Sequence, residues 1–249
     1  MMDTSTLTAV FLLACLSGFT TVLGVLLAVY VSRSENWIAM GIGFSAGIML
    51  LISFFELIPE SLALARQVNV LLAVLAGTVL IGAMHYLIPH THLFREKGII
   101  GSRLVRTSYL VAFGLILHDF PEGFAMANAY ITSPDMGMAV ALAIALHNIP
   151  EEFAMAVPAA ALRHKRFLLR AAIISGLAEP LGAGVGLLAA HVNPSLVPMF
   201  MAFAAGAMIF VSLHELVPMA KQYGRLAMFV SGMLVSVVAY VLLAGLFPE

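Results

Sequence analysis

The stretch H-D-F-P-E-G-F-A-M-A (His118–Ala127) occurs a second time as H-N-I-P-E-E-F-A-M-A (His147–Ala156), with seven of ten positions unchanged. Each copy lies inside an apolar stretch of about 20 residues or more, the length that a helix needs to cross a bilayer. Ionisable residues are costly at that depth and usually serve a function there. The repeated stretch therefore decides both the class of fold and the kind of chemistry.

The composition agrees with a membrane location. Hydrophobic residues make up 62% and charged residues only 10% of the 249 residues, against roughly 45–50% and about 25% in soluble domains. The mean hydropathy is +1.04. These values exclude a disordered chain and a nucleic-acid-binding protein. The single Cys15 excludes an intrachain disulfide and a cysteine-based metal site.

The apolar pattern predicts an all-α integral membrane protein with one transmembrane domain over residues 1–249. The connections are short, and the longest covers 90–107. Eight transmembrane helices are expected, at residues 6–31, 36–59, 68–89, 108–131, 136–160, 167–190, 195–219 and 224–247.

The basic residues predict the direction of these spans. Eleven of the twelve Lys and Arg residues lie in or beside connections that alternation of the spans places on one side, and only Arg66 lies on the other. Cytoplasmic loops carry the excess of basic residues. Both termini are therefore expected outside, in a multi-pass protein of the cell inner membrane.

A second internal repeat relates more distant segments. Gly43–Pro59 and Ala202–Pro218 share eight of seventeen positions, including Ser53 with Ser212 and Glu56 with Glu215. Under the predicted topology the members of each pair run in opposite directions. Inverted repeats with a polar centre are typical of transporters.

The acidic residues of the spans have no basic partners, because no Lys or Arg lies in the core of any span. A carboxylate at the bilayer centre costs at least ~2.5 kcal/mol. Such groups must be protonated, hydrated or neutralised by a cation. Those predicted near one depth, together with two histidines and an amide, are His118, Asp119, Glu122, His147, Asn148, Glu151 and Glu179.

Their spacing indicates a metal centre. His118 and Glu122 are four residues apart, as are His147 and Glu151, so each pair lies on one helix face. Glu122 and Glu151 are placed to bridge two adjacent ions. Imidazole, carboxylate and amide ligands suit zinc, iron, manganese, cobalt or cadmium, which are expected as substrates rather than as catalytic cofactors.

Two further groups near the span ends are predicted to line a transport path. Glu56 and Glu60 lie near the expected outer end of their span and would attract cations. The residues expected at the inner end are His85, His90, His214 and Glu215. Pro121, Pro150 and Pro180 each remove a backbone hydrogen bond beside the polar residues and are expected to kink their helices.

The paired H-x-x-P-E motifs, the E-P at Glu179 and the H-E-x-x-P at His214 together resemble the ZIP (Zrt/Irt-like) family of divalent metal transporters, and most closely its bacterial ZupT/GufA-type branch. The resemblance implies eight helices, metal uptake into the cytoplasm, elevator-like movement and a homodimer. It assigns the seven residues above to a centre of two metals, adds Met49 from the second helix, and assigns His85, His90, His214 and Glu215 to the inner release route.

Three positions depart from the family pattern. The first motif has Asp119 where Asn is common, and the second has Asn148, so the acid of the second site comes from the opposite helix. Glu152 replaces the usual Gly, which calls the helix packing at that position into question. The alternatives left open are an intramembrane metalloenzyme, although H-E-x-x-H is absent, and a proton-coupled carrier of another solute.

Overall fold

The computed structural model describes residues 3–30, 34–87, 119–160 and 165–247, and every regular element in these ranges is helical. The elements are α1 (Thr4–Tyr30), α2 (Glu35–Ile52), the π-helical turn η1 (Ser53–Leu57), α3 (Ile58–Leu64), α4 (Gln67–Leu87), a helix through 119–132, α6 (Pro134–Ala160), α7 (Lys165–Gly176), α8 (Ala178–Val192), the 3₁₀ turn η3 (Pro194–Leu196), α9 (Val197–Val211), the π-helical turn η4 (Ser212–Leu216), α10 (Val217–Gln222) and α11 (Leu226–Leu246).

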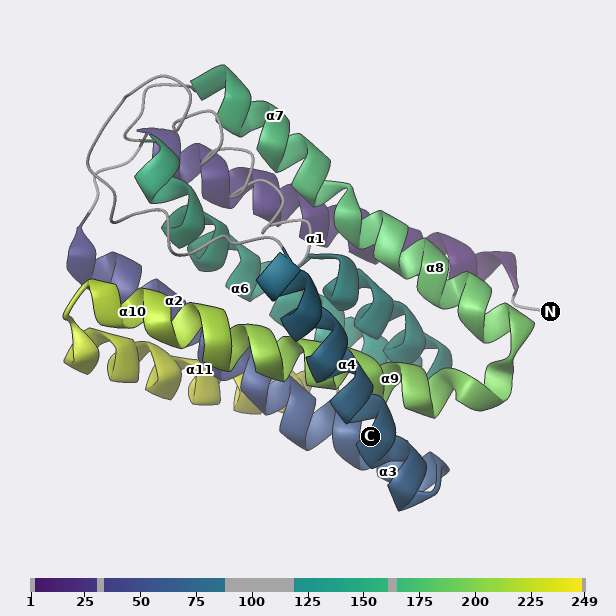
Figure 1. Cartoon of the computed structure of the whole chain (residues 1–249). Coiled ribbons are helices and arrows are strands. Elements are labelled where there is room, and N and C mark those ends of the chain that lie inside the picture. Colours follow the sequence, from purple (N-terminus) through teal and green to yellow (C-terminus); the bar gives the residue numbers. More distant parts are fainter. Residues whose placement is uncertain (1–2, 31–33, 88–118, 161–164, 248–249) are drawn as a thin grey trace.

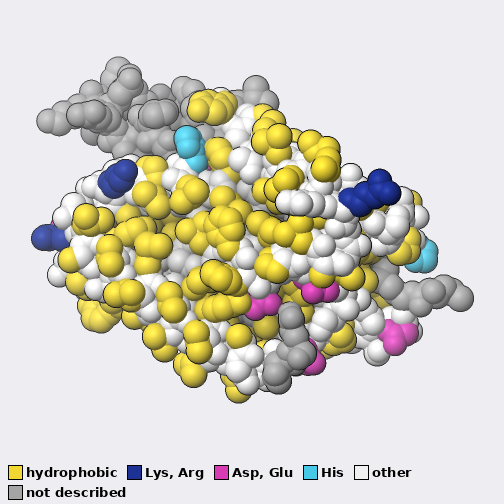
Figure 2. Space-filling view, turned by 90° about the horizontal axis from the view of Figure 1, so that it is seen from below, with side chains coloured by type: hydrophobic (Ala, Val, Ile, Leu, Met, Phe, Trp, Pro, Cys, Tyr) yellow, Lys and Arg dark blue, Asp and Glu magenta, His cyan; other side chains and the backbone are white. Residues whose placement is uncertain are grey.

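Six helical segments of the described part are long and apolar enough to cross a membrane: Thr4–Tyr30, Glu35–Leu64, Gln67–Met84, Leu168–Val192, Pro194–Gln222 and Leu226–Leu246. Helix α6 is long enough but falls outside this group, because the polar residues around His147 and Glu151 lower its hydropathy. Residues 108–118 of the expected span 108–131 lie outside the described part, and 119–131 are helical. Hydrophobic side chains cover most of the face in Figure 2, while basic side chains lie toward its two ends. The chain is thus a multi-pass helical membrane protein.

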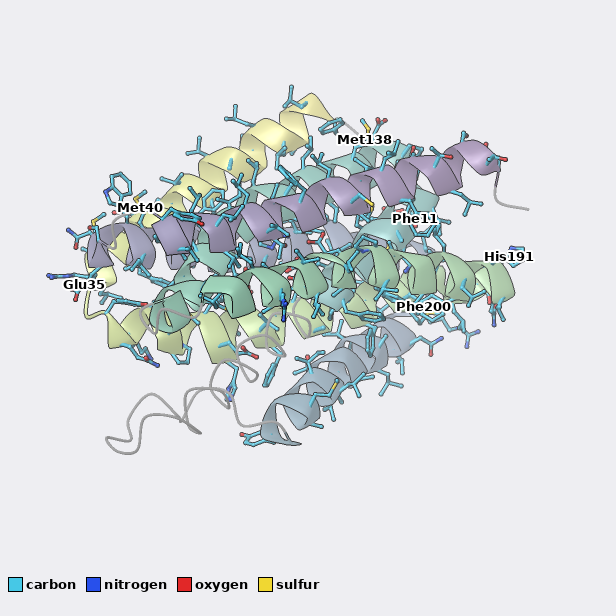
Figure 3. All side chains as sticks on the ribbon, turned by 90° about the horizontal axis from the view of Figure 1, so that it is seen from above. Phe11, Glu35, Met40, Met138, His191 and Phe200 are labelled. Atoms are coloured by element: carbon cyan, nitrogen blue, oxygen red, sulfur yellow. The ribbon has the colours of Figure 1, made fainter. Side chains whose placement is uncertain are left out.

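The helices run along one long direction, so the molecule has two ends (Figure 1). We call the end where α7 begins and α10 turns into α11 the basic end, because Lys221 and Arg225 lie at that turn. Arg66 lies in the α3–α4 turn at the opposite end. Glu35 and His191 also mark these two ends (Figure 3).

The second sequence repeat forms two matching π-helical turns. In η1 the Ile58 N–H donates to the Ser53 carbonyl, and in η4 the Val217 N–H donates to the Ser212 carbonyl. A proline follows each turn and cannot donate to the carbonyl four residues earlier, so the wider turn accommodates its ring. Helices α2 and α9, which lead into these turns, run in opposite directions (Figure 1).

A kink is expected at Pro180, and the helix is interrupted nearby: α7 ends at Gly176 and α8 begins at Ala178. Proline has no N–H, so the Gly176 carbonyl loses its helical donor. That carbonyl faces α1 so closely that a side chain on Gly18 would collide with it. Helix α6, by contrast, continues through Pro150 without a break.

Glycines bring the helices into close contact within two groups. The first group, called the site-bearing helices, consists of α1, the 119–132 helix, α6, α7 and α8. The second, called the flanking helices, consists of α2, α3, α4, α9, α10 and α11. In the flanking helices, Gly206 of α9 meets the backbone of α4, and Gly232 of α11 meets the backbone of α2. Close backbone approach at small residues is the usual packing mode in membranes.

The two groups meet where α2 packs on α6 and where the 119–132 helix packs on α9. Phe124 contacts Phe200 and Phe203 edge-on, with ring centroids 5.6 and 6.3 Å apart. Ser45 of α2 donates a 2.9 Å hydrogen bond to the carbonyl of His147. This junction places the centre of α6 between the two groups of helices.

Candidate metal centre

Two groups of ligand residues converge near the middle of the site-bearing helices. Glu122, His147 and Glu151 form one, and Asp119, Glu122 and Glu179 form the other. Within each group the ligand atoms lie within 4.8 Å of one another, and every residue is buried. Glu122 belongs to both groups, so the two groups are neighbours.

His147 is oriented as a metal ligand. Its Nδ1 donates a 2.9 Å hydrogen bond to the Ala143 carbonyl, which leaves the lone pair on Nε2. Nε2 faces Glu122 Oε1 at 3.2 Å and Glu151 Oε2 at 4.0 Å. Histidines that bind metals commonly fix their ring in this way, with the other nitrogen donating to a carbonyl.

Helix α1 positions the second group through Asn148 and Glu179. The Asn148 amide nitrogen donates to Glu179 Oε1 at 2.7 Å and to Thr21 Oγ1 at 3.1 Å, and lies 3.3 Å from Ser17 Oγ. Thr21 also donates to Glu179 Oε1 at 3.2 Å. In this arrangement Asn148 holds Glu179 in place, and it is the amide nitrogen that faces the carboxylate.

Asp119 is fixed by the neighbouring helix α7. Ser175 donates a 2.6 Å hydrogen bond to Asp119 Oδ2, and both side chains are buried. Gly123 and Gly182 bring the 119–132 helix and α8 together, because a side chain on either would collide with the other helix's backbone. This close approach brings Asp119 and Glu122 within reach of Glu179.

Two buried carboxylate oxygens of the site lack a protein partner in the described part of the chain. Among the described residues, Glu122 Oε2 and Glu179 Oε2 have no hydrogen-bond partner, although both are buried. Uncompensated buried charge is strongly unfavourable. Divalent ions bound between these carboxylates would supply both the missing charge and the missing partners.

Met49 lies on α2 at the junction of the two groups of helices. Its side chain is buried, and its sulfur lies 3.6 Å from Ser212 Oγ of η4. Ser45, one turn earlier on α2, bonds the backbone of His147. Met49 therefore lies one helical turn from the α2 residue that contacts the His147 backbone.

The predicted path residues have varied surroundings. Glu56 is half-buried and accepts a 2.7 Å hydrogen bond from Tyr240 of α11, and Glu60 is half-buried on α3. His214 is exposed and stacks on Phe210 with ring centroids 4.7 Å apart, while Glu215 beside it is buried. The predicted residues that lie outside the described part are His90, His118 and the side chain of His85.

Sequence reasoning missed the hydroxyl groups that hold the carboxylates and the α6 backbone: Ser17, Thr21, Ser45 and Ser175. Ser17 and Thr21 could have been recognised, since they are four residues apart and so share one face of an apolar helix. Nothing in the local sequence pairs Ser175 with Asp119, because 56 residues separate them.

Comparisons with known proteins identify the family of this chain. A family model described as ZIP zinc transporter matches residues 89–245. A protein named zinc transporter ZupT from Corynebacterium aurimucosum is 38% identical over 244 residues, covering 90% of this chain and 91% of its own length.

Two further ZupT proteins give similar values. The one from Chlorobium limicola is 36% identical over 91% of this chain and 93% of its own, and the one from Escherichia fergusonii is 38% identical over 85% and 86%. Their names describe transporters, not enzymes, and metal ions are substrates in such proteins. By its family model, its relatives and its paired His–Glu motifs, this chain belongs to the ZIP zinc transporter family.

Proposed function

We propose that this protein carries divalent transition metals, with zinc as the main substrate, across the inner membrane into the cytoplasm. The observation that supports this proposal most strongly is the pair of buried ligand groups that share Glu122. Two ions there would compensate the charges of Asp119, Glu122, Glu151 and Glu179. The names of the curated relatives point to the same substrate.

The donor set supports a choice among metals. The group containing His147 offers nitrogen and oxygen, which suits zinc, iron, cobalt or cadmium. The group containing Asp119 offers only oxygen, which also suits manganese. Met49 would add a soft sulfur next to the first group.

The eight-span topology with both termini outside is part of this proposal. Lys221 and Arg225 lie at the basic end and Arg66 at the other, as the basic-residue rule requires. The expected span 108–131, of which 108–118 lie outside the described part, is the fourth span of this proposal. The basic end would then face the cytoplasm.

Alternating access by an elevator-like movement fits the division of the helices. The hydrogen bonds that hold Glu179 and Asp119 come from α1, α6 and α7, all of them site-bearing helices. The described contacts to the flanking helices are mostly apolar, with Ser45 to His147 as a polar exception. The site-bearing helices would move as one body, against flanking helices held in a homodimer.

Metal flux into proteoliposomes tests the function. Purified protein is assayed with Zn²⁺, Fe²⁺, Mn²⁺, Co²⁺ and Cd²⁺ at two pH values. Wild type should admit Zn²⁺, and His147→Ala should abolish Zn²⁺ uptake while the protein stays monodisperse, because the nitrogen ligand is lost.

The control is Glu35→Gln, which alters an exposed carboxylate paired with Arg225 far from the centre. It should transport as wild type does. Flux of another solute that persists after all divalent ions are removed would instead favour a proton-coupled carrier, with the carboxylates as relays.

A further inference from the structure

The two H-x-x-P-E copies differ at the residue after the glutamate, which is Gly123 in one and Glu152 in the other. In the first copy the position has no room, because a side chain on Gly123 would collide with the carbonyl of Glu179. In the second copy a full glutamate side chain is accommodated and buried, with 1% exposure. The two copies therefore use the same position differently.

Helix α1 provides the space for Glu152. A Cβ on Gly24 would lie 2.7 Å from the Cβ of Glu152 and 2.6 Å from the Ile149 carbonyl oxygen. At this contact the glycine is on α1 instead of on the helix that carries the motif, and the two helices still pack closely. Glu152 therefore does not prevent close packing of α6 against α1.

Glu152 is a buried acid with an unsatisfied oxygen. Its Oε2 has no hydrogen-bond partner among the described residues. Its carboxylate interacts electrostatically with those of Asp119, Glu151, Glu122 and Glu179, most strongly with Asp119. The side chain is buried beside α1 among the site-bearing helices, and Asp119 is its strongest electrostatic neighbour.

The position of Glu152 extends the centre in one direction. Glu152 is one turn after Asn148 on α6, and Asp119 is nearly one turn before Glu122 on the antiparallel 119–132 helix. Both displacements lead away from His147 toward the basic end. Asp119 lies in the ligand group of Glu179 and is also the strongest electrostatic neighbour of Glu152.

We propose that Glu152 and Asp119 form a third cation position next to the two-ion centre, built only of oxygen ligands. This inference rests on the proposed function. A fifth carboxylate leaves one negative charge that two divalent ions do not compensate. Carboxylate and water ligands suit Mn²⁺ better than ligand sets containing nitrogen. The third position would receive ions that leave the centre toward the basic end.

Mn²⁺ binding to the purified full-length chain tests this position. Free Mn²⁺ is measured by electron paramagnetic resonance during titration of wild type, Glu152→Gln and Glu152→Gly. Each variant should bind one Mn²⁺ fewer per chain than wild type. Mn²⁺ uptake should fall about tenfold, the lower bound for disturbing the surroundings of a bound metal, while Zn²⁺ still binds at the two-ion centre.

Two variants guard against a folding defect, because Gln keeps the size of the side chain and Gly reproduces the residue of the other copy. Glu35→Gln serves as the matched acid-to-amide control and should leave the Mn²⁺ count unchanged. Equal Mn²⁺ counts and an equal Mn²⁺ to Zn²⁺ preference in wild type and both variants would overturn the third position, and wild-type Zn²⁺ flux would show that the proposed function itself survives. A wild type that binds and transports neither metal would overturn both proposals.

Discussion

The site-bearing and flanking helices are packed alike but differ in chemistry. Both groups use glycines for close backbone contact, as at Gly18 with Gly176 and at Gly77 with the Phe203 backbone. In the described part, the site-bearing helices bury five carboxylates, whereas the flanking helices bury one, that of Glu215. Close packing therefore serves the whole bundle, while the binding chemistry is concentrated in one group.

The repeat in the flanking helices includes the two turns η1 and η4, and neither turn contributes to the two ligand groups. The two π-helical turns have the same hydrogen bonds, and Ser53 and Ser212 each donate to the carbonyl four residues earlier at 2.8 Å. Yet the matching acids differ, since Glu56 is half-buried and bonded to Tyr240 while Glu215 is buried. The repeated backbone is kept where the side-chain surroundings have diverged.

The largest expected effect on Zn²⁺ uptake comes from replacing Glu122, and it tests whether binding is confined to the site-bearing helices. Glu122→Ala removes the ligand common to both groups, so we expect Zn²⁺ uptake to fall beyond the ~10- to 100-fold loss typical of disturbing a partner of a metal ligand. Equilibrium dialysis with Zn²⁺ and proteoliposome flux measure the loss. Full uptake in Glu122→Ala would mean that the centre is not the transport site.

An intermediate effect on stability is expected in the flanking helices. Gly206→Ala places a Cβ against the Val74 carbonyl and forces α4 and α9 apart, which should cost about 1–3 kcal/mol. Zn²⁺ affinity of the folded protein should remain unchanged, because the centre lies in the other group. Thermal unfolding in detergent measures the first quantity, and dialysis measures the second.

Gly245→Ala is the matched control, since its Cβ would meet no atom of the described chain within 4 Å. It should leave the melting temperature near that of wild type. If Gly206→Ala weakened Zn²⁺ binding while Gly245→Ala did not, the two groups of helices would not be separable in the way proposed.

The smallest expected effect is a change in metal preference when Asp119, in the site-bearing helices, loses its charge. Asp119→Asn keeps an oxygen that can accept from Ser175 but removes a charge, so folding should be preserved. We expect the preference for Zn²⁺ over Mn²⁺ to change by about 1 kcal/mol, a factor of about five. Competition flux with both ions measures it, and an unchanged ratio would contradict a ligand role for Asp119.

Much of this protein was predictable from local sequence. Apolar segments of bilayer length predict helices, because in lipid each backbone N–H and C=O group must find a hydrogen-bond partner within its own segment. The His–Glu spacing predicted which residues share a helix face, and His147 and Glu151 do lie together in one ligand group. Pro180 marked the irregularity between α7 and α8.

Other features depended on contacts between segments far apart in the chain. The hydroxyls of Thr21 and Ser175 hold Glu179 and Asp119 across separations of 158 and 56 residues. The room for Glu152 is supplied by Gly24, on a different helix. Composition and spacing determined the helices, their repeats and the ligand types, because these follow from the needs of a single helix in lipid. Which carboxylates lie within reach of one another, and which acid fits where a glycine was expected, was decided only by how the helices approach one another.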